Sequence, residues 1–399
     1  MIKIVWWESC ITEHQIYTLI ELSNMPGVEV TVFSTSMENE ARKKQGWHEC
    51  DWSLIDMSLI PSPGVGFILN AMQRKDESIH IFGGPFDSWK ITAALFLSLF
   101  FRNRTYILTE PYCPISSALL DNGNRFKNML LPMLRPIKFR LLWTVLRTRL
   151  EGVFTISHLA IDQLLSFGVS REKIFPYGYF VPPMQVNLNF TNLELKRDSA
   201  DKDLRLIFVG SLNHRKGIDL LVNAVNQLRN TGVRVTLDVF GPAGRLKDYC
   251  WSNYVRYRGV IPFGEAQSVM ATYDFLVLPS RFDGWGVVVN EALLSGIPII
   301  CSDKVGAASL VQKWGCGAVY DSSTASSLES CISKIYHDKE KVLEAYKKSV
   351  DQVCQVITPK CGAHYICECI DGKWPKGLGE ESSWYSEDTT KFLKGNGQD

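Results

Sequence analysis

Short apolar runs alternate along the chain with segments in which apolar residues recur at helical spacing. This alternation is typical of a parallel β-sheet flanked by helices, so the sequence predicts an α/β fold. In the first half we expect strands at Ile2–Trp7, Val28–Phe33, Ile79–Phe82, Thr105–Leu108 and Gly152–Ile156. Helical spacing in the same half is found at Gln15–Leu22, Ser88–Phe101 and Leu159–Phe167.

The pattern dissolves between Pro182 and Asp203, and a second α/β unit begins after it. Its predicted strands are Leu204–Val209, Arg234–Phe240, Phe275–Leu278 and Ile297–Cys301, and its predicted helices are Ile218–Asn230 and Val288–Leu294. Further helices follow from Ser326 to Ile370. At 399 residues the chain suits two domains of about 100–200 residues each. We therefore predict domains at 1–181 and 204–372, a linker at 182–203, and a tail at 373–399 that either packs back or frays.

Composition narrows the class of protein. Apolar residues make up 46% and charged residues 21%, which is normal for a globular protein. A net charge of +1 argues against a nucleic-acid partner. The first apolar run is too short for a signal peptide, and the longest, Ile91–Phe101, is too short to span a membrane. The eleven cysteines are scattered without metal-ligand spacing, so we expect reduced thiols, no bound metal and a cytoplasmic location.

A candidate phosphate site follows the strand Leu204–Val209. There the segment from Gly210 to Gly217 places small residues and the cations Arg215 and Lys216 directly before a helix. The free N–H groups at a helix start attract anions, and cations add to this. An ordinary turn with two solvated cations is the alternative at this point.

A second strand end lies at Leu278, and a glycine-bearing loop and a helix start follow it. Gly284 and Gly286 allow a ligand to approach the backbone closely. The acids Asp283 and Glu291 bracket the loop and helix, and carboxylates suit sugar hydroxyls as cations suit phosphate. Alone, Asp283 would be a turn residue and Glu291 a solvated helix acid. Together with the first turn, they indicate a site for a nucleotide sugar.

The segment from Asp283 to Pro298 resembles the signature of retaining glycosyltransferases of family 4, in which two acids precede a Gly-x-Pro step, here Gly296-Ile297-Pro298. The resemblance covers the second domain and implies the GT-B fold, in which two Rossmann-like domains face a central cleft. It implies that Glu291 holds ribose, Asp283 the donor sugar, and Lys216 with Arg215 the diphosphate. The other donor-binding residues that it implies are Arg258, Gly259, Gly284, Trp285, Gly286 and Val287.

Three departures from the family pattern matter. Asp283 stands where glutamate is commoner, and Ser211 where many relatives carry arginine. The first domain lacks the usual Gly-Gly loop and has Glu110 where many relatives have histidine. Because His14 and Glu110 both follow predicted strands at the expected cleft, we predict that they contact the acceptor or the transferred sugar. A helix-capping histidine and a plain loop carboxylate are the alternatives.

Residues 125–150 form a basic amphipathic stretch without an acid. Its cations are Arg125, Lys127, Arg135, Lys138, Arg140, Arg147 and Arg149. Such a stretch suits an anionic membrane surface, or else a helix that packs on the first domain with its cations in water. We expect Pro132 and Pro136 to break it into pieces.

We therefore expect a retaining enzyme that moves a hexose-type sugar from a nucleoside-diphosphate sugar to an acceptor hydroxyl without a metal or other cofactor. The expected acceptor is a saccharide, lipid-linked in surface polysaccharide synthesis such as O-antigen or capsule, at the inner face of the cell membrane. A non-catalytic nucleotide-binding or scaffold protein of the same fold is the alternative. A dehydrogenase ranks low because the turn after Val209 has no G-x-G-x-x-G sequence.

Overall fold

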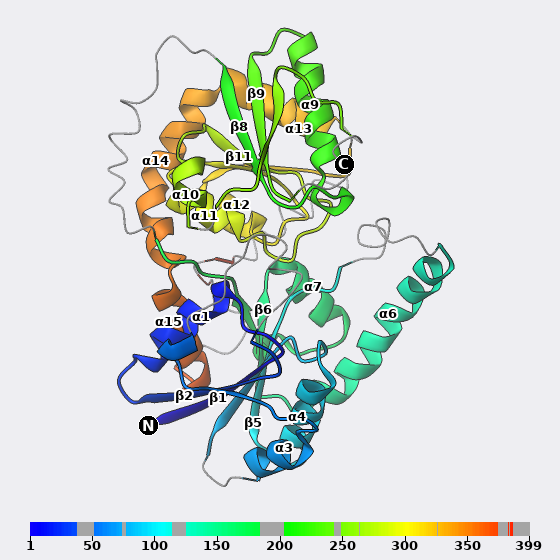
Figure 1. Cartoon of the computed structure of the whole chain (residues 1–399), viewed down its shortest axis with the longest axis vertical. Coiled ribbons are helices and arrows are strands. Elements are labelled where there is room, and N and C mark those ends of the chain that lie inside the picture. Colours follow the sequence, from blue (N-terminus) through cyan, green and yellow to red (C-terminus); the bar gives the residue numbers. More distant parts are fainter. Residues whose placement is uncertain are drawn as a thin grey trace.

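The chain folds into two α/β domains stacked end to end, as the computed structural model shows (Figure 1). The structure describes residues 1–37, 52–73, 77–113, 125–183, 203–242, 249–262, 264–324, 326–373, 382, 384 and 385. Most of the predicted linker therefore lies outside the described residues.

The N-terminal sheet has seven parallel strands in the order β3-β2-β1-β4-β5-β6-β7. The strands are β1 Ile2–Glu8, β2 Val28–Ser34, β3 Met57–Leu59, β4 Ile79–Gly83, β5 Arg104–Thr109, β6 Gly152–Ile156 and β7 Ile174–Tyr177. The helices are α1 Glu13–Ser23, α3 Val65–Met72, α4 Trp89–Phe100, α6 Arg125–Leu146 and α7 His158–Ser166, with short 3-10 turns at Trp52–Leu54 and Arg171–Lys173. All five strands predicted here are confirmed, whereas β3 and β7 were missed.

The C-terminal sheet has six parallel strands in the order β10-β9-β8-β11-β12-β13. The strands are β8 Leu204–Val209, β9 Val235–Phe240, β10 Val255–Gly259, β11 Phe275–Leu278, β12 Ile299–Ser302 and β13 Gly317–Tyr320. The helices are α9 Ile218–Asn230, α10 Ala266–Met270, α11 Val288–Leu294, α12 Ala308–Trp314, α13 Ser327–His337, α14 Lys339–Val356 and α15 Pro359–Ile370. The predicted α/β class with two Rossmann-like domains is confirmed.

Each sheet has one point at which the strand order reverses. In the N-terminal sheet the chain runs from β1 outward to β3 and then returns to β4 beside β1. In the C-terminal sheet it runs from β8 to β10 and then returns to β11 beside β8. Loops that leave neighbouring strands in opposite directions part there, and ligands of open α/β sheets bind at such points.

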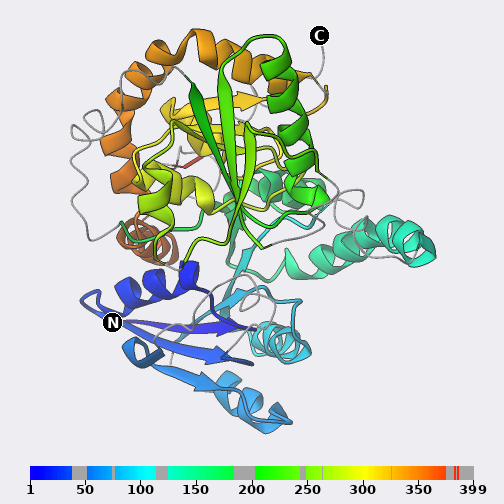
Figure 2. The same ribbon diagram turned by 45° about the horizontal axis from the view of Figure 1, so that its top comes forward.

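The last part of the chain crosses from the second domain back to the first. Helix α15 lies along α1 (Figures 1 and 2), and Cys367 Sγ approaches Met25 Sδ at 3.6 Å. The ring of Phe180 packs against Gly362 so closely that a Cβ there would lie 2.5 Å from it. Arg104 also donates to the Ile370 carbonyl oxygen at 2.8 Å. The C-terminal helix thus contributes to the core of the N-terminal domain.

The tail packs back on the fold at Ser382, Trp384 and Tyr385. The Trp384 side chain is buried, its indole donates to the Pro176 carbonyl oxygen at 2.9 Å, and its ring meets the rings of Tyr177, Phe180 and Tyr365. From the other domain, Ser309 donates to the Trp384 carbonyl oxygen at 3.2 Å, and Lys313 to that of Ser382 at 2.7 Å. The tail therefore binds both domains at once.

Helix α6 projects from the N-terminal domain (Figures 1 and 2). It runs without interruption from Arg125 to Leu146, so the predicted break at Pro132 and Pro136 is wrong. Each proline removes one N–H bond, yet the segment remains one continuous helix. None of the helices in the described ranges has the length and apolar character needed to cross a membrane.

A buried carboxyl group, Glu8, ends β1 at the point where the N-terminal strand order reverses. Its side chain accepts a hydrogen bond from Gln15 at 2.9 Å, and Asp87 lies within electrostatic reach. Burial, with a smaller contribution from Asp87, raises the pKa of Glu8 from 4.5 to about 8. The folded protein therefore holds Glu8 in its protonated form at neutral pH.

We expect Trp384→Ala to lower the free energy of unfolding by about 3–5 kcal/mol, because it empties a site between aromatic rings and leaves the Pro176 carbonyl oxygen unpaired. Urea denaturation of the full chain measures this. Trp89→Ala is the control, since Trp89 is 60% exposed, and we expect a change within about 0.5 kcal/mol. Equal losses in the two variants would contradict the packing of the tail.

We also expect Glu8 to make stability depend on pH. Its folded pKa of about 8 lies above the unfolded value of 4.5, so the free energy of unfolding decreases as pH rises through this window. Glu8→Gln stays neutral, so its free energy of unfolding relative to that of the wild type should rise by on the order of 4 kcal/mol between about pH 5 and about pH 8. Urea titrations at several pH values measure this, with the exposed Glu29→Gln as control. Parallel pH profiles for wild type and Glu8→Gln would refute it.

Candidate functional site

The predicted phosphate turn lies where the C-terminal strand order reverses, between the ends of β8 and β11. A short 3-10 turn, η4 His214–Lys216, follows β8, and the Asn213 side chain caps it by accepting from the Lys216 N–H at 3.0 Å. Gly217 then begins α9 with φ +69°, and a Cβ there would lie 1.9 Å from the Pro279 carbonyl oxygen. Only glycine allows these two loops to approach so closely.

The two loops are joined by an ion pair. Lys216 Nζ lies 2.6 Å from Asp283 Oδ2, and the two side chains are 15% and 11% exposed. Arg215 Nη1 donates to the Phe282 carbonyl oxygen at 2.9 Å and lies 3.8 Å from Asp283 Oδ1. The structure thus brings together three residues that the sequence analysis assigned to the diphosphate and the donor sugar.

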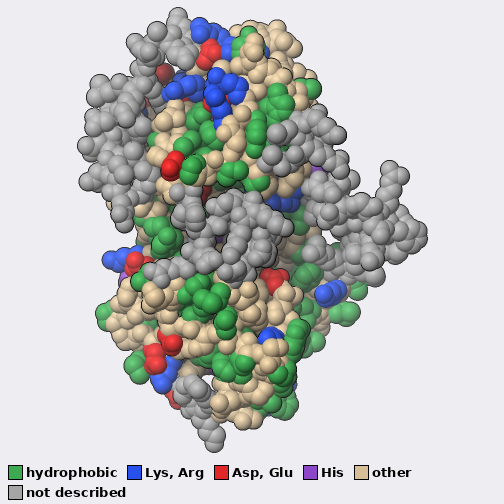
Figure 3. Space-filling view, in the orientation of Figure 1, with side chains coloured by type: hydrophobic (Ala, Val, Ile, Leu, Met, Phe, Trp, Pro, Cys, Tyr) green, Lys and Arg blue, Asp and Glu red, His purple; other side chains and the backbone are tan. Residues whose placement is uncertain are grey.

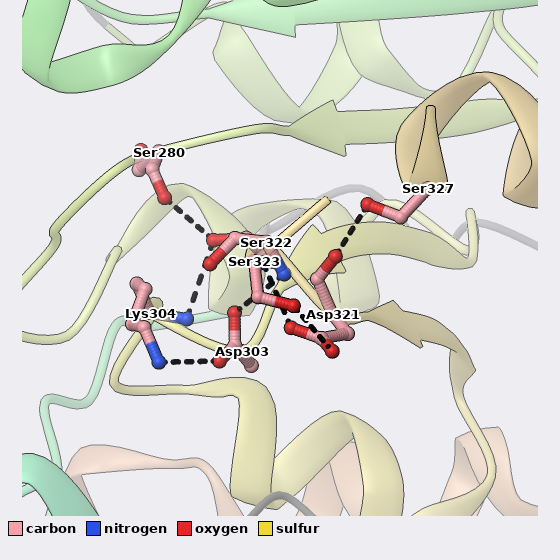
Figure 4. A network of polar contacts seen from close by, with 8 residues as sticks. Ser280, Asp303, Lys304, Asp321, Ser322, Ser323 and Ser327 are labelled. Carbon is pink, nitrogen blue, oxygen red and sulfur yellow. Dashed lines mark hydrogen bonds and ion pairs between the residues drawn. The ribbon is translucent and has the colours of Figure 1, made fainter. Parts of the chain in front are cut away.

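A polar network behind the loop fixes its backbone (Figure 4). Ser302 donates to the Ser280 carbonyl oxygen at 2.5 Å and accepts from the Lys304 N–H at 3.3 Å. Asp283 N–H in turn donates to the Lys304 carbonyl oxygen at 3.0 Å. Because both ends of the segment are held, the Asp283 carboxylate has a defined position against Lys216.

Glu291 lies in the first turn of α11 and is half-buried. Its burial raises the pKa from 4.5 to about 7. Among the residues that the structure describes, no side chain forms an ion pair or hydrogen bond with its carboxylate. A ligand hydroxyl that donates to Glu291 would favour the ionised form and recover part of the desolvation cost.

Three further predicted donor residues lie around the ends of the neighbouring strands. Arg258 and Gly259 end β10, and Gly259 accepts from the Gly241 N–H at 2.8 Å, which ties them to the end of β9. Arg258 Nε lies 3.2 Å from Asp238, so this side chain is engaged in an ion pair. Val287 precedes α11 as its N-cap.

Trp285 has a side chain that belongs to the interface between the domains. The indole is 3% exposed, lies over Gly178 of the N-terminal domain, and donates to Asn290 Oδ1 at 2.8 Å. We predicted that Trp285 contacts the donor. Because its side chain is buried between the domains, only its backbone could make that contact.

The N-terminal candidates His14 and Glu110 lie on either side of Tyr179. The Tyr179 hydroxyl donates a short hydrogen bond to Glu110 Oε1, and the His14 ring lies 5.5 Å from the Tyr179 ring. Glu110 also reaches the loop of residues 279–287 between β11 and α11, called the donor loop, since a Cβ at Gly284 would lie 2.8 Å from Glu110 Oε2. Two candidates that lie far apart in the sequence thus both contact Tyr179, and Glu110 also contacts the donor loop.

The residues predicted from the sequence did not include three buried or interface polar residues, namely Glu8, Tyr179 and Asn290. Asn290 is fully buried and donates to the Tyr179 carbonyl oxygen at 2.9 Å, which links α11 to the N-terminal domain. An amide beside Glu291 on an otherwise apolar helix was a readable signal. For Tyr179 the sequence offered no such signal, because it is only one of several aromatic residues in that stretch.

Among the described residues there is no cluster of three or more histidine, cysteine, aspartate or glutamate side chains suited to a metal ion. The groups that meet between β8 and β11 are two cations, glycines and the Asp283 carboxylate, and Glu291 lies in the first turn of the helix that follows. Such a set can bind a diphosphate at the cations and hydroxyl groups at the carboxylates.

Comparison with known proteins agrees with this geometry. Residues 190–351 match the family described as glycosyl transferases group 1. A Bacillus subtilis protein named as a teichuronic acid biosynthesis glycosyltransferase is 27% identical over 188 residues, which are 47% of each chain. The O-antigen chain mannosyltransferase B of Escherichia coli is 26% identical over 169 residues, 40% of this chain and 44% of the relative. The chain thus spans about half the length of the curated relatives it matches.

Solved structures extend the likeness to the N-terminal domain. WaaG, a glycosyltransferase of lipopolysaccharide biosynthesis, aligns with TM-score 0.60 and 13% identity over 92% of this chain and 100% of its own. Anabaena HepE, solved with UDP, aligns with TM-score 0.65 and 15% identity over 93% and 100%. These likenesses show the GT-B fold. Residues 190–351 thus resemble the glycosyl transferases group 1 family, within a chain that has the two-domain GT-B fold.

Proposed function

We propose that this protein transfers a hexose-type sugar from a nucleoside-diphosphate sugar to an acceptor hydroxyl, with retention at the anomeric carbon. The observation that carries the proposal is the meeting of Lys216, Arg215 and Asp283 where the C-terminal strand order reverses. A half-buried Glu291 on the adjoining helix complements them.

The charges match the parts of such a donor. In the free protein Lys216 is neutralised by Asp283 at 2.6 Å, so the pair holds both charged groups ready beside the loop. When a diphosphate binds, Lys216 and Arg215 contact phosphate, and Asp283 contacts hydroxyls of the sugar next to it. Glu291 then accepts from the ribose at the other end of the diphosphate.

Leaving-group stabilisation is the catalytic task of these residues. Negative charge grows on the diphosphate as its bond to the sugar breaks, and fixed cations stabilise that charge without reorganisation. Cations therefore take the role that a metal ion fills elsewhere, and we propose that the reaction needs no metal or other cofactor.

Glu110 and His14 form the other side of the reaction site in this proposal. Glu110 lies against Gly284 of the donor loop, and the His14 ring lies 5.5 Å from the ring of Tyr179, whose hydroxyl bonds to Glu110. A carboxylate there can orient the acceptor hydroxyl or the transferred sugar.

The names of similar proteins support the choice of substrates. HepE was solved with UDP-glucose, and the Escherichia coli relative is named a mannosyltransferase of the O-antigen chain. We propose a hexose donor and a saccharide acceptor, lipid-linked, in surface polysaccharide synthesis on the cytoplasmic side of the membrane.

We expect one nucleotide sugar of a panel to raise the melting temperature of the wild type and to release free nucleoside diphosphate. Glu291→Ala should abolish both effects, because it removes the acceptor for the ribose hydroxyls. Lys216→Ala should lower the rate of release by at least about a hundredfold, since it removes a cation from the leaving group.

Glu344→Ala is the matched control, because Glu344 is an exposed acid on α14. It should behave as the wild type in both assays. If no nucleotide sugar stabilises the wild type, the transferase proposal fails. Stabilisation without release of nucleoside diphosphate, with every acceptor tried, would leave the non-catalytic binding protein.

We further propose that α6 contacts an anionic membrane surface. Its described half exposes Ile137, Leu141 and Val145, at 57%, 66% and 59%, spaced four residues apart on one helix face. Lys138 and Arg140 lie exposed beside this stripe. Hydrophobic side chains are also visible at the surface of the N-terminal domain in Figure 3. Apolar residues that enter the headgroup region, flanked by cations, suit anionic lipid.

We expect the protein to sediment with vesicles that contain anionic phospholipid and much less with zwitterionic ones. Leu141→Glu should reduce sedimentation with anionic vesicles about tenfold, because it places a charge on the apolar stripe. Val260→Glu, at an exposed apolar position of the C-terminal domain, is the control and should bind normally. Equal binding of both variants would refute a role for α6.

A further inference from the structure

Tyr179 lies just beyond β7, where the N-terminal domain meets the donor loop. Its hydroxyl donates to Glu110 Oε1, and its ring packs at a tilt of 54° against His14. The hydroxyl therefore touches one predicted reaction-site residue while the ring touches the other. Tyr179 itself was not among the predicted residues.

Glu110 is held from two directions. The loop that carries it is fixed by Gln163 of α7, which accepts from the Tyr112 N–H at 3.0 Å and donates to the Tyr112 carbonyl oxygen at 2.9 Å. The carboxylate itself is fixed by the Tyr179 hydroxyl. In this position Oε2 occupies the space that a side chain at Gly284 would fill, 2.8 Å from a Cβ there.

The backbone of Tyr179 is bound by the other domain. Its carbonyl oxygen accepts from Asn290 Nδ2 at 2.9 Å, and Asn290 Oδ1 accepts from the Trp285 indole at 2.8 Å. Both Asn290 and Trp285 are buried, so these bonds are shielded from water. Asn290 directly precedes Glu291 on α11. Tyr179 is thus bonded through its side chain to Glu110 and through its main chain to Asn290 of α11.

We propose that Tyr179 is a positioning residue that holds the Glu110 carboxylate against the donor loop and ties it to the helix that carries Glu291. The inference rests on the proposed transferase function and adds to it. Glu110 then meets the sugar bound over Gly284 in one orientation, and that orientation is set by the domain that binds the donor.

The physical reason is the freedom of a glutamate side chain. An exposed carboxylate on a loop samples several rotamers, and each one moves its oxygens by more than a bond length. A reacting group that is misplaced by about 1 Å can lose on the order of a hundredfold in rate. One short hydrogen bond from a rigid phenol limits this freedom, because the phenol ring is itself packed against His14.

The experiment compares four proteins with the nucleotide sugar that stabilises the wild type: the wild type, Tyr179→Phe, Glu110→Ala and the double variant. We expect Tyr179→Phe to lower kcat for nucleoside diphosphate release by about tenfold or more. Donor affinity should stay within about twofold, because the hydroxyl that is removed bonds to Glu110, which is not one of the predicted donor-binding residues. In the Glu110→Ala background, Tyr179→Phe should leave kcat almost unchanged, since its effect on kcat passes through Glu110.

Tyr254→Phe is the control for loss of a phenolic hydroxyl, because Tyr254 is 43% exposed and lies under Arg229 in the other domain. It should keep the wild-type kcat. Equal losses from Tyr179→Phe with and without Glu110 would overturn the positioning role and leave the transferase proposal intact. A wild type that binds no donor and releases no nucleoside diphosphate would overturn both.

Discussion

The ion pair between Lys216 and Asp283 is the interaction on which the rest of the site depends. It forms only because the loops after β8 and β11 leave neighbouring strands at the point where the strand order reverses. A glycine at 217 permits the approach, and the Ser302 network holds the facing loop from behind. Separating either loop would leave a largely buried charge without its partner, which costs more than the pair itself contributes.

The contact between the domains is part of the site. Trp285 of the donor loop lies over Gly178, Asn290 bonds to Tyr179, and Glu110 reaches Gly284. Helix α15 and the Trp384 segment, near the C-terminal end of the sequence, also hold these two domains together. The reaction geometry therefore depends on domain placement, and a single domain would carry only half of it.

Each domain has one glutamate with a raised pKa, and the two carboxyl groups differ in their partners. Glu8 is enclosed with Gln15 as its partner, and its pKa of about 8 keeps it neutral as a part of the packed core. Glu291 has a pKa of about 7 and a carboxylate without a described partner, so it remains available to a ligand. The same cause, burial, thus acts on a structural group in one domain and, in the proposed function, on a ligand-binding group in the other.

The sequence by itself determined the α/β class, most strands and the donor motif, because these depend on local patterns. Buried parallel strands read as apolar runs, and Arg215, Lys216, Asp283 and Glu291 lie just beyond such runs. The strands β3, β7, β10 and β13, which form the edges of the two sheets, were missed. Helix α6 was predicted to break at its prolines because local rules cannot see that it projects into solvent.

Only the tertiary structure decided which residues from distant segments meet. That Tyr179 would bind Glu110 and Asn290, that α15 would join the first domain, and that Trp384 would lie between both domains depends on strand order and domain placement. These contacts join residues separated by up to hundreds of positions, and no local spacing encodes them. Their physical origin is the packing of two sheets whose carboxyl ends face each other.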